Sequence, residues 1–113
     1  MAQHNKQNKV ATIKSFRIER ISLSGGRIQP KLILGVETEK QQTFEISEAI
    51  IDKDGTETCQ GLWLNMDKDG KVAKKSTLNT LLKFFNVESI DDLLEKEVNI
   101  RPNPQQYFAI YCK

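Results

Sequence analysis

Three aromatic side chains fall on the side of their expected strands that faces away from the apolar residues. Trp63 alternates with Leu62 and Leu64, whereas Tyr107 and Tyr111 share the face of the last strand opposite its apolar series. Aromatic rings that do not pack in the core can stack on planar groups. Each nucleic-acid base stacked in this way contributes roughly 1–3 kcal/mol to the free energy of binding. The same rings could instead pack against a helix, an oligomer interface or an N-terminal arm.

Basic side chains accompany these rings along the sequence. Four lysines follow Trp63, and the first two expected strands with their turn add five further cations. The nine residues are Lys68, Lys71, Lys74 and Lys75, together with Lys14, Arg17, Arg20, Arg27 and Lys31. Cations can follow the phosphates of a polyanion, because this attraction is local and is screened within about 10 Å at 0.1 M salt. We therefore predict a basic groove across the early strands and residues 68–75, with Trp63 and the tyrosines as stacking platforms.

The net charge of +2 hides a division of charge along the chain. Residues 1–36 carry seven basic side chains and one acidic side chain, whereas residues 37–62 carry two basic and seven acidic ones. Residues 63–85 are basic again, and residues 86–113 are weakly acidic. Because each block spans one or two strands, the pattern indicates a basic and an acidic face on one domain. Ordinary solvated surface charge is the alternative interpretation.

No side chains have the spacing of a catalytic or metal-binding set. His4 is the sole histidine, and no Ser/His/Asp or Cys/His combination can be assembled around it. Two DKDG segments imitate part of an EF-hand loop, but Ser76 and Gly61 stand where the bidentate glutamate belongs. Both segments are instead predicted to be hairpin turns. We expect no catalytic residue, no metal and no cofactor, and we do not expect an enzyme.

Alternating apolar residues predict strands over most of the chain. The expected strands cover residues 12–23, 30–38, 43–51, 62–66, 97–101 and 107–112. In the first of them the alternation slips by one residue near Glu19 and Arg20, which predicts a β-bulge at that point.

One segment has the periodicity of a long helix. Four apolar residues recur at the i, i+3, i+4, i+7 spacing of one helical face, namely Leu78, Leu81, Leu82 and Phe85. Ser76 suits the N-cap and Asn86 suits the end, so a helix is predicted over residues 76–85. Residues 89–92 have a capping-box pattern and predict a further helical turn that buries Leu93 and Leu94.

A helix between the third and fourth strands of an otherwise β chain is the element order of a small Greek-key barrel. We therefore expect a β-rich α+β fold, a five-stranded barrel of the oligonucleotide-binding (OB) type, with the helix closing its bottom. A chain of 113 residues suits a single domain. Residues 1–11 are assigned to a flexible polar N-terminal arm and residues 12–113 to the OB-fold-like domain.

The sequence predicts a cytoplasmic protein. No apolar run approaches the roughly 20 residues of a membrane span, and the N-terminal segment lacks the hydrophobic part of a secretory signal. Cys59 and Cys112 have no metal-binding spacing, which predicts free thiols in a reducing compartment.

The chain resembles a known family over most of its length. The run GLWLNMDKDGKVAKKSTLNTLLKFFNVESIDDLLEKEVNI, followed by a YFAIY strand, is similar to small single-stranded-DNA-binding proteins of phages of Gram-positive bacteria, the lactococcal phage type in particular. The resemblance covers residues 12–112 and depends on an S-x-L-x-x-L-L helix, a V-x-S-I-x-x-L segment and the aromatic last strand. It implies a homodimer or larger homo-oligomer that coats single strands during phage replication and recombination. It assigns no role to any single residue.

The C-terminus departs from the cellular relatives of that family. Those proteins carry a flexible acidic tail that recruits replication partners, whereas this chain ends in a strand pattern with Lys113 as its last residue. We therefore do not expect partners to be recruited through an acidic tail.

The expected function is the binding of single-stranded DNA without strong sequence preference. The alternative is a small β-barrel that acts as a protein-interaction module in a phage or bacterial accessory protein, with the exposed rings forming an apolar patch. Charge reversal at Lys74 and Lys75 would abolish binding under the first interpretation and matter little under the second.

Overall fold

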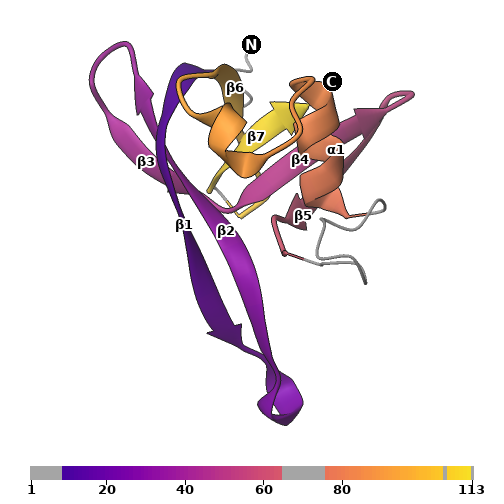
Figure 1. Cartoon of the computed structure of the whole chain (residues 1–113). Coiled ribbons are helices and arrows are strands. Elements are labelled where there is room, and N and C mark those ends of the chain that lie inside the picture. The colour runs from indigo at the N-terminus through magenta and orange to yellow at the C-terminus, as the bar shows by residue number, and fades with distance from the viewer. Residues whose placement is uncertain (1–8, 65–75, 106, 113) are drawn as a thin grey trace.

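The computed structural model describes residues 9–64, 76–105 and 107–112, and these residues form a β-rich α+β fold (Figure 1). Seven strands form one sheet: β1 (Lys9–Ser22), β2 (Ile28–Thr38), β3 (Thr43–Ile46), β4 (Glu48–Lys53), β5 (Thr56–Gly61), β6 (Glu97–Pro102) and β7 (Phe108–Cys112). Between β5 and β6 lie the helix α1 (Thr77–Phe84) and a 3-10 turn, η2 (Ile90–Leu93). A second 3-10 turn, η1 (Ser24–Gly26), links β1 to β2.

The strands follow the order β3-β2-β1-β6-β7-β4-β5 across the sheet. Neighbouring strands are antiparallel except for β4 and β7, which run parallel from the pair Ala49–Ile110 to the pair Ile51–Cys112. β3 pairs with β2, whereas β4 begins only one residue later, after Ser47, and pairs with β5 and β7. One bent segment of the chain therefore contributes to two places that are far apart in the strand order.

The structure contains more strands than the sequence predicts. The single strand expected over residues 43–51 is divided into β3 and β4, and β5 follows in residues for which no strand was expected. β5 is polar and exposed, so it has no apolar alternation to reveal it. It forms because Asp54 and Gly55 adopt φ values of 53° and 85°, as a two-residue hairpin turn requires. The hairpin predicted at the first DKDG segment is thus confirmed, while the second lies outside the described residues.

The strand predicted over residues 62–66 is wrong in its described part. Trp63 forms only an isolated bridge with Lys31, and Met66 lies outside the described residues. The Leu62 N–H donates to the carbonyl oxygen of Ser47 at 2.9 Å, and the Leu64 N–H donates to that of Pro30 at 2.9 Å. Because the segment crosses from β4 to β2, its backbone bonds are split between two partners and no ladder extends from it.

The β-bulge of the first strand lies earlier than predicted. The register between β1 and β2 shifts between Ile13 and Ser15, whereas the pairing from Ser15 to Ser22 is regular through the predicted site. The early bulge lets Ile13 and Phe16, three residues apart, both face the core. Ile21 therefore lies on the face opposite to Phe16, which is tolerated because this part of the strand extends away from the core. Residues 9–11, expected in the N-terminal arm, belong to β1 and pair with β6.

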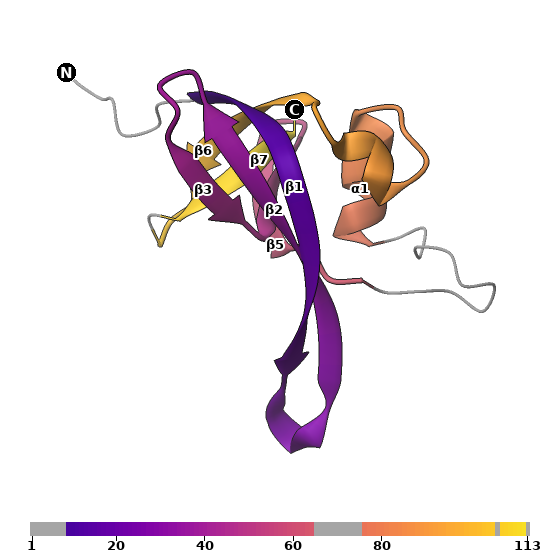
Figure 2. The ribbon, with the colours of Figure 1, turned by 60° about the vertical axis from the view of Figure 1, so that its left-hand side comes forward.

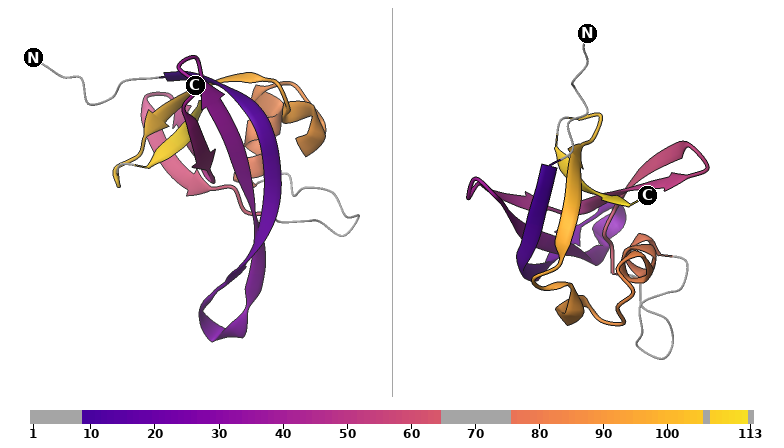
Figure 3. Two further views of the ribbon diagram at one scale, coloured as in Figure 1. Left: turned by 90° about the vertical axis from the view of Figure 1, so that its left-hand side faces the viewer. Right: turned by 90° about the horizontal axis from the view of Figure 1, so that it is seen from above.

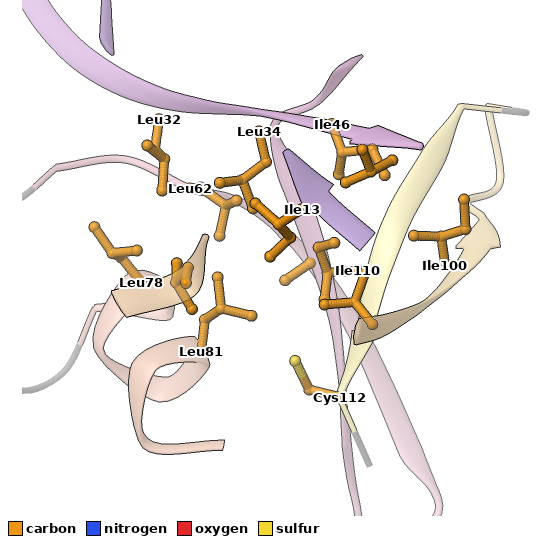
Figure 4. Close-up of a cluster of buried hydrophobic side chains, with 14 of the residues drawn as sticks. Ile13, Leu32, Leu34, Ile46, Leu62, Leu78, Leu81, Ile100, Ile110 and Cys112 are labelled. Atoms are coloured by element: carbon orange, nitrogen blue, oxygen red, sulfur yellow. The ribbon is translucent and has the colours of Figure 1, made fainter. Parts of the chain in front are cut away.

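The hydrophobic core lies between the curved sheet and α1. Side chains from β1, β2, β3 and β7 converge with those of the helix, as Figure 4 shows for Ile13, Leu34, Ile46, Ile110 and Leu81. The helical residues Leu78, Leu81 and Leu82 are buried, as their spacing predicts. The three leucines of the apolar stripe are therefore used in packing, and Phe85, at the C-cap, packs against the same core while only partly buried.

Both predicted ends of the helix are confirmed. The Ser76 side chain accepts a hydrogen bond from the Asn79 N–H at 3.0 Å, which makes Ser76 the N-cap. Asn86 has φ of 57°, and the Val87 N–H donates to the Leu82 carbonyl at 3.0 Å, a geometry that ends helices. The further turn predicted after residue 89 is η2. It buries Leu93, but Leu94 remains 38% exposed, so that part of the prediction is wrong.

The β1–β2 hairpin, defined here as residues 17–33, projects from the rest of the molecule (Figures 1 and 2). The projection lengthens the molecule, whose principal extents are 48 × 29 × 28 Å. None of the described helices is long and apolar enough to span a membrane.

Candidate functional site

Trp63 lies where the segment after β5 crosses β2. Its backbone bridges to Lys31, and the ammonium nitrogen of Lys31 stands 4.8 Å from the centroid of the indole ring. The Trp63 side chain is half-buried and faces away from the core that Leu62 enters. A cation over an indole is attracted by about 0.5–1 kcal/mol at an exposed site. The fold thus brings a predicted ring and a predicted cation into contact across 32 residues of sequence.

Gly61 leaves the space in which this ring lies. A Cβ atom at residue 61 would stand 2.7 Å from Trp63 Nε1 and 3.0 Å from Lys31 Cε. Any larger residue would therefore displace the indole or the lysine. This role is not evident from the sequence, because a glycine at the end of a strand indicates a close approach only once its spatial neighbour is known.

Three predicted cations keep their charge available for a ligand. Arg20 and Arg27 are exposed on the β1–β2 hairpin, and neither forms an ion pair within the described residues. Lys31 contacts the Trp63 ring and, among the described side chains, pairs with no carboxylate. The structure brings Lys31 and Trp63 into contact at the base of the hairpin, whereas Arg20 and Arg27 lie further along it, Arg20 on the opposite face of the ribbon from Lys31.

Two other predicted cations are engaged by carboxylates. Arg17 donates from both terminal nitrogens to Glu45, at 2.5 and 3.0 Å, and from Nε to Glu19 at 2.9 Å. The hydrogen bonds from Arg17 lower the pKa of Glu45, and those to Glu45 and Glu19 raise the pKa of Arg17. Lys14 is paired with Glu95 at 3.1 Å. Both cations have a partner that a phosphate would have to displace.

Tyr111 is held by its ring and by its hydroxyl group. The guanidinium carbon of Arg101 stands 4.0 Å from the ring centroid, and the Tyr111 hydroxyl donates to Asp52 at 3.2 Å. Arg101 is 8% exposed and forms an ion pair with Glu57, whose hydrogen bond raises the pKa of Arg101. A base could stack only on the other face of Tyr111. Arg101 was missed in the sequence, where nothing distinguishes it from other alternating residues of a strand.

Tyr107 is the most exposed of the predicted rings, at 72%. It follows a loop that Asn103 organises, since the Asn103 side-chain oxygen accepts the N–H groups of Gln105 and Tyr107, both at 2.9 Å. The Asn103 amide donates to Glu48 at 2.5 Å. Tyr107 therefore has a free ring, next to a loop that is anchored to an acidic strand.

The predicted residues fall into two groups. Trp63 bridges to β2 beside Lys31, whereas Tyr111 pairs with Ile50 of β4, and the charged groups near the tyrosines include carboxylates of β4 and β5. Those carboxylates are Glu48, Asp52 and Glu57. The four lysines of the predicted loop, Lys68, Lys71, Lys74 and Lys75, lie outside the described residues.

The described residues contain no group of three or more His, Cys, Asp or Glu side chains that could hold a metal ion. In comparisons with known proteins, no family model, no curated protein and no solved structure matches the chain.

Proposed function

We propose that the chain binds single-stranded DNA without strong sequence preference and protects exposed strands during phage replication or recombination. The observation that carries the proposal is the half-buried Trp63 ring beside Lys31, at the base of a hairpin whose Arg20 and Arg27 have no ion-pair partner in the described structure. An aromatic ring can stack on any base, and cations beside it attract phosphates. A ring with neighbouring cations therefore binds a single strand without preference for its sequence. The resemblance to phage single-stranded-DNA-binding proteins supports the same function.

The strand order supports an OB-type barrel as the scaffold. β3 and β4 are interrupted by Ser47 alone, so together they act as one bent third strand that pairs with β2 at its start and with β7 at its end. The rings of Phe44 on β3 and Phe108 on β7 lie 4.6 Å apart, as closure of the sheet between these strands requires. The helix then follows the bent strand and its hairpin partner β5, and it precedes the fourth barrel strand, β6.

In the proposed mechanism Trp63 is the main stacking platform. Lys31 fixes the ring and contributes a charge to the neighbouring phosphate, while Arg20 and Arg27 extend the positive surface along the hairpin. Tyr107 can add a second platform because its ring is exposed, whereas Tyr111 serves chiefly to anchor β7 to Arg101 and Asp52.

The proposal is tested by titrating the protein with oligothymidine while following Trp63 fluorescence. We expect quenching at low salt and an affinity that falls steeply as salt rises. Trp63→Ala and Lys31→Glu should weaken binding strongly, whereas Lys40→Glu, the same charge reversal at an exposed residue in the β2–β3 turn, should change it little. Absence of quenching at low salt, or binding that salt does not affect, would contradict the proposal.

A protein-interaction module is the second candidate, favoured by exposed aliphatic residues on the hairpin. Ile18 and Ile28 are 47% and 62% exposed. Under this function, Lys74→Glu with Lys75→Glu would leave binding of the partner intact, and an oligonucleotide would not quench Trp63.

A further inference from the structure

The β1–β2 hairpin reaches well beyond the strands that pair with its base. Six cross-strand pairs run from Arg17–Ile33 to Ser22–Ile28, and Gly25 and Gly26 close the tip with φ values of 81° and 77°. Six pairs at 3.3–3.4 Å per residue span about 20 Å. The left view of Figure 3 shows this two-stranded ribbon standing clear of the other elements.

The hairpin lacks the side chains that would stack on unpaired bases. Residues 17–33 contain no Phe, Tyr or Trp, while Trp63, whose ring has Lys31 over one face, lies at their base. What the hairpin offers instead is positive charge from Arg20 and Arg27, together with the exposed aliphatic residues Ile18 and Ile28. Its only acidic residue, Glu19, is bonded to Arg17.

This chemistry suits a duplex better than a single strand. A two-stranded β-ribbon fits the major groove of B-DNA, where arginines bind phosphates and base edges and aliphatic side chains contact thymine methyl groups. A length of about 20 Å spans roughly six base pairs at 3.4 Å per step. Single-strand binding without sequence preference depends on aromatic platforms, and these begin only at Trp63.

We propose that the preferred ligand is a junction at which duplex DNA meets a single strand, with the duplex along the β1–β2 hairpin and the first unpaired bases at Trp63. The inference rests on the proposed single-strand function and specifies its substrate. The free charges of Arg20 and Arg27 contact the duplex, and the Trp63–Lys31 pair marks the point where pairing ends.

The test compares three DNAs at one salt concentration: a single strand of about 16 nucleotides, a blunt duplex of about 12 base pairs, and that duplex carrying the same strand as a tail. In the tailed duplex the paired and unpaired parts of one DNA molecule occupy the β1–β2 hairpin and Trp63 together. The tailed duplex should therefore bind at least about tenfold more tightly than either separate DNA. The variant Arg20→Gln/Arg27→Gln should lower the affinity for the tailed duplex by a larger factor than the affinity for the single strand, and so remove this preference. Lys40→Gln/Lys96→Gln removes the same charge from exposed residues outside the hairpin and should keep the preference.

The outcomes separate the two proposals. If the single strand binds and quenches Trp63 but the tailed duplex binds no better, the junction inference is overturned and the single-strand function stands. If the single strand does not bind at all, the proposed function fails, and the junction inference fails with it. If Ile28→Ser dissociates a dimer, as measured by sedimentation, without changing junction affinity, the hairpin is an interface between copies and the inference is likewise overturned.

Discussion

The cations that the sequence presents as equivalent differ in the structure because of their carboxylate neighbours. Arg17 is bonded to Glu45 and Glu19 and Lys14 to Glu95, whereas Arg20 and Arg27 have no such partner among the described residues. Counterion release on binding depends on cations that can exchange solvent for phosphate. A paired arginine must first give up its carboxylate and therefore contributes less.

Glu45→Gln is expected to strengthen DNA binding. The change removes one of the two carboxylates that hold Arg17, so that the guanidinium can reach a phosphate. We expect a several-fold gain in affinity. We also expect the slope of log affinity against log salt concentration to become steeper by up to about one unit. Both are measured by fluorescence titration at several salt concentrations. Glu88→Gln removes the same charge from an exposed residue after α1 and is the control. Equal effects of the two substitutions would contradict the role assigned to Glu45.

The two cysteines should differ in reactivity towards thiol reagents. Cys59 is exposed, whereas Cys112 is 4% exposed and its burial raises its pKa to about 12. Partial burial and the nearby Glu48 carboxylate also raise the pKa of Cys59, so at neutral pH less thiolate is present than in a free cysteine. We expect Cys59 to be alkylated first, more slowly than a free thiol and faster as pH rises. Cys59→Ser should leave a protein that reacts only after unfolding, and rapid alkylation of this variant in its native state would contradict the burial of Cys112.

At the scale of elements, local signals were sufficient for α1 and insufficient for β5. The helix carries its own N-cap, its own apolar stripe and its own ending residue, all within residues 76–86, and each is confirmed. β5 is polar throughout and depends on pairing with β4. A strand without an apolar face gains its stability from the neighbouring strand, which the sequence does not specify locally.

Ser76→Ala should lower the free energy of unfolding by about 1 kcal/mol, because the Asn79 N–H loses its capping acceptor. The measurement is denaturant unfolding of both proteins. Ser89→Ala is the matched control, since the Ser89 hydroxyl donates to the Asp92 side chain and caps no backbone N–H. If the control destabilises the protein as much as Ser76→Ala does, capping is not the cause.

For the whole molecule, the decisive feature is that one bent segment serves two parts of the sheet. Ser47 separates β3 from β4, and the contact between Phe44 and Phe108 joins β3 to β7. The β1–β2 hairpin, which carries Arg20 and Arg27, and the acidic β4–β5 hairpin project in different directions (Figure 1).

A double-mutant cycle on Phe44 and Phe108 tests closure of the sheet between β3 and β7. If the two rings join the edges of the barrel, Phe44→Leu and Phe108→Leu should be coupled by about 0.5–1.5 kcal/mol in the free energy of unfolding. Phe44→Leu combined with Phe85→Leu of the helix end should be additive, because those rings do not contact each other. Additivity in both cycles would show that the Phe44–Phe108 contact does not stabilise the fold.

The sequence by itself determined the elements whose signals lie within a few residues: α1 with both its ends, the Asp54–Gly55 turn, the outward orientation of Trp63 and the approximate limits of β6 and β7. Only the tertiary structure decided the bulge at residue 14, the division of the third strand, the engagement of Tyr111 by Arg101, and the contact of Lys31 with Trp63. The physical reason is that periodicity records which face of an element is apolar, whereas a site depends on which side chains meet. Arg17 and Lys31 have similar positions in the pattern of neighbouring strands, yet one meets a carboxylate and the other an aromatic ring.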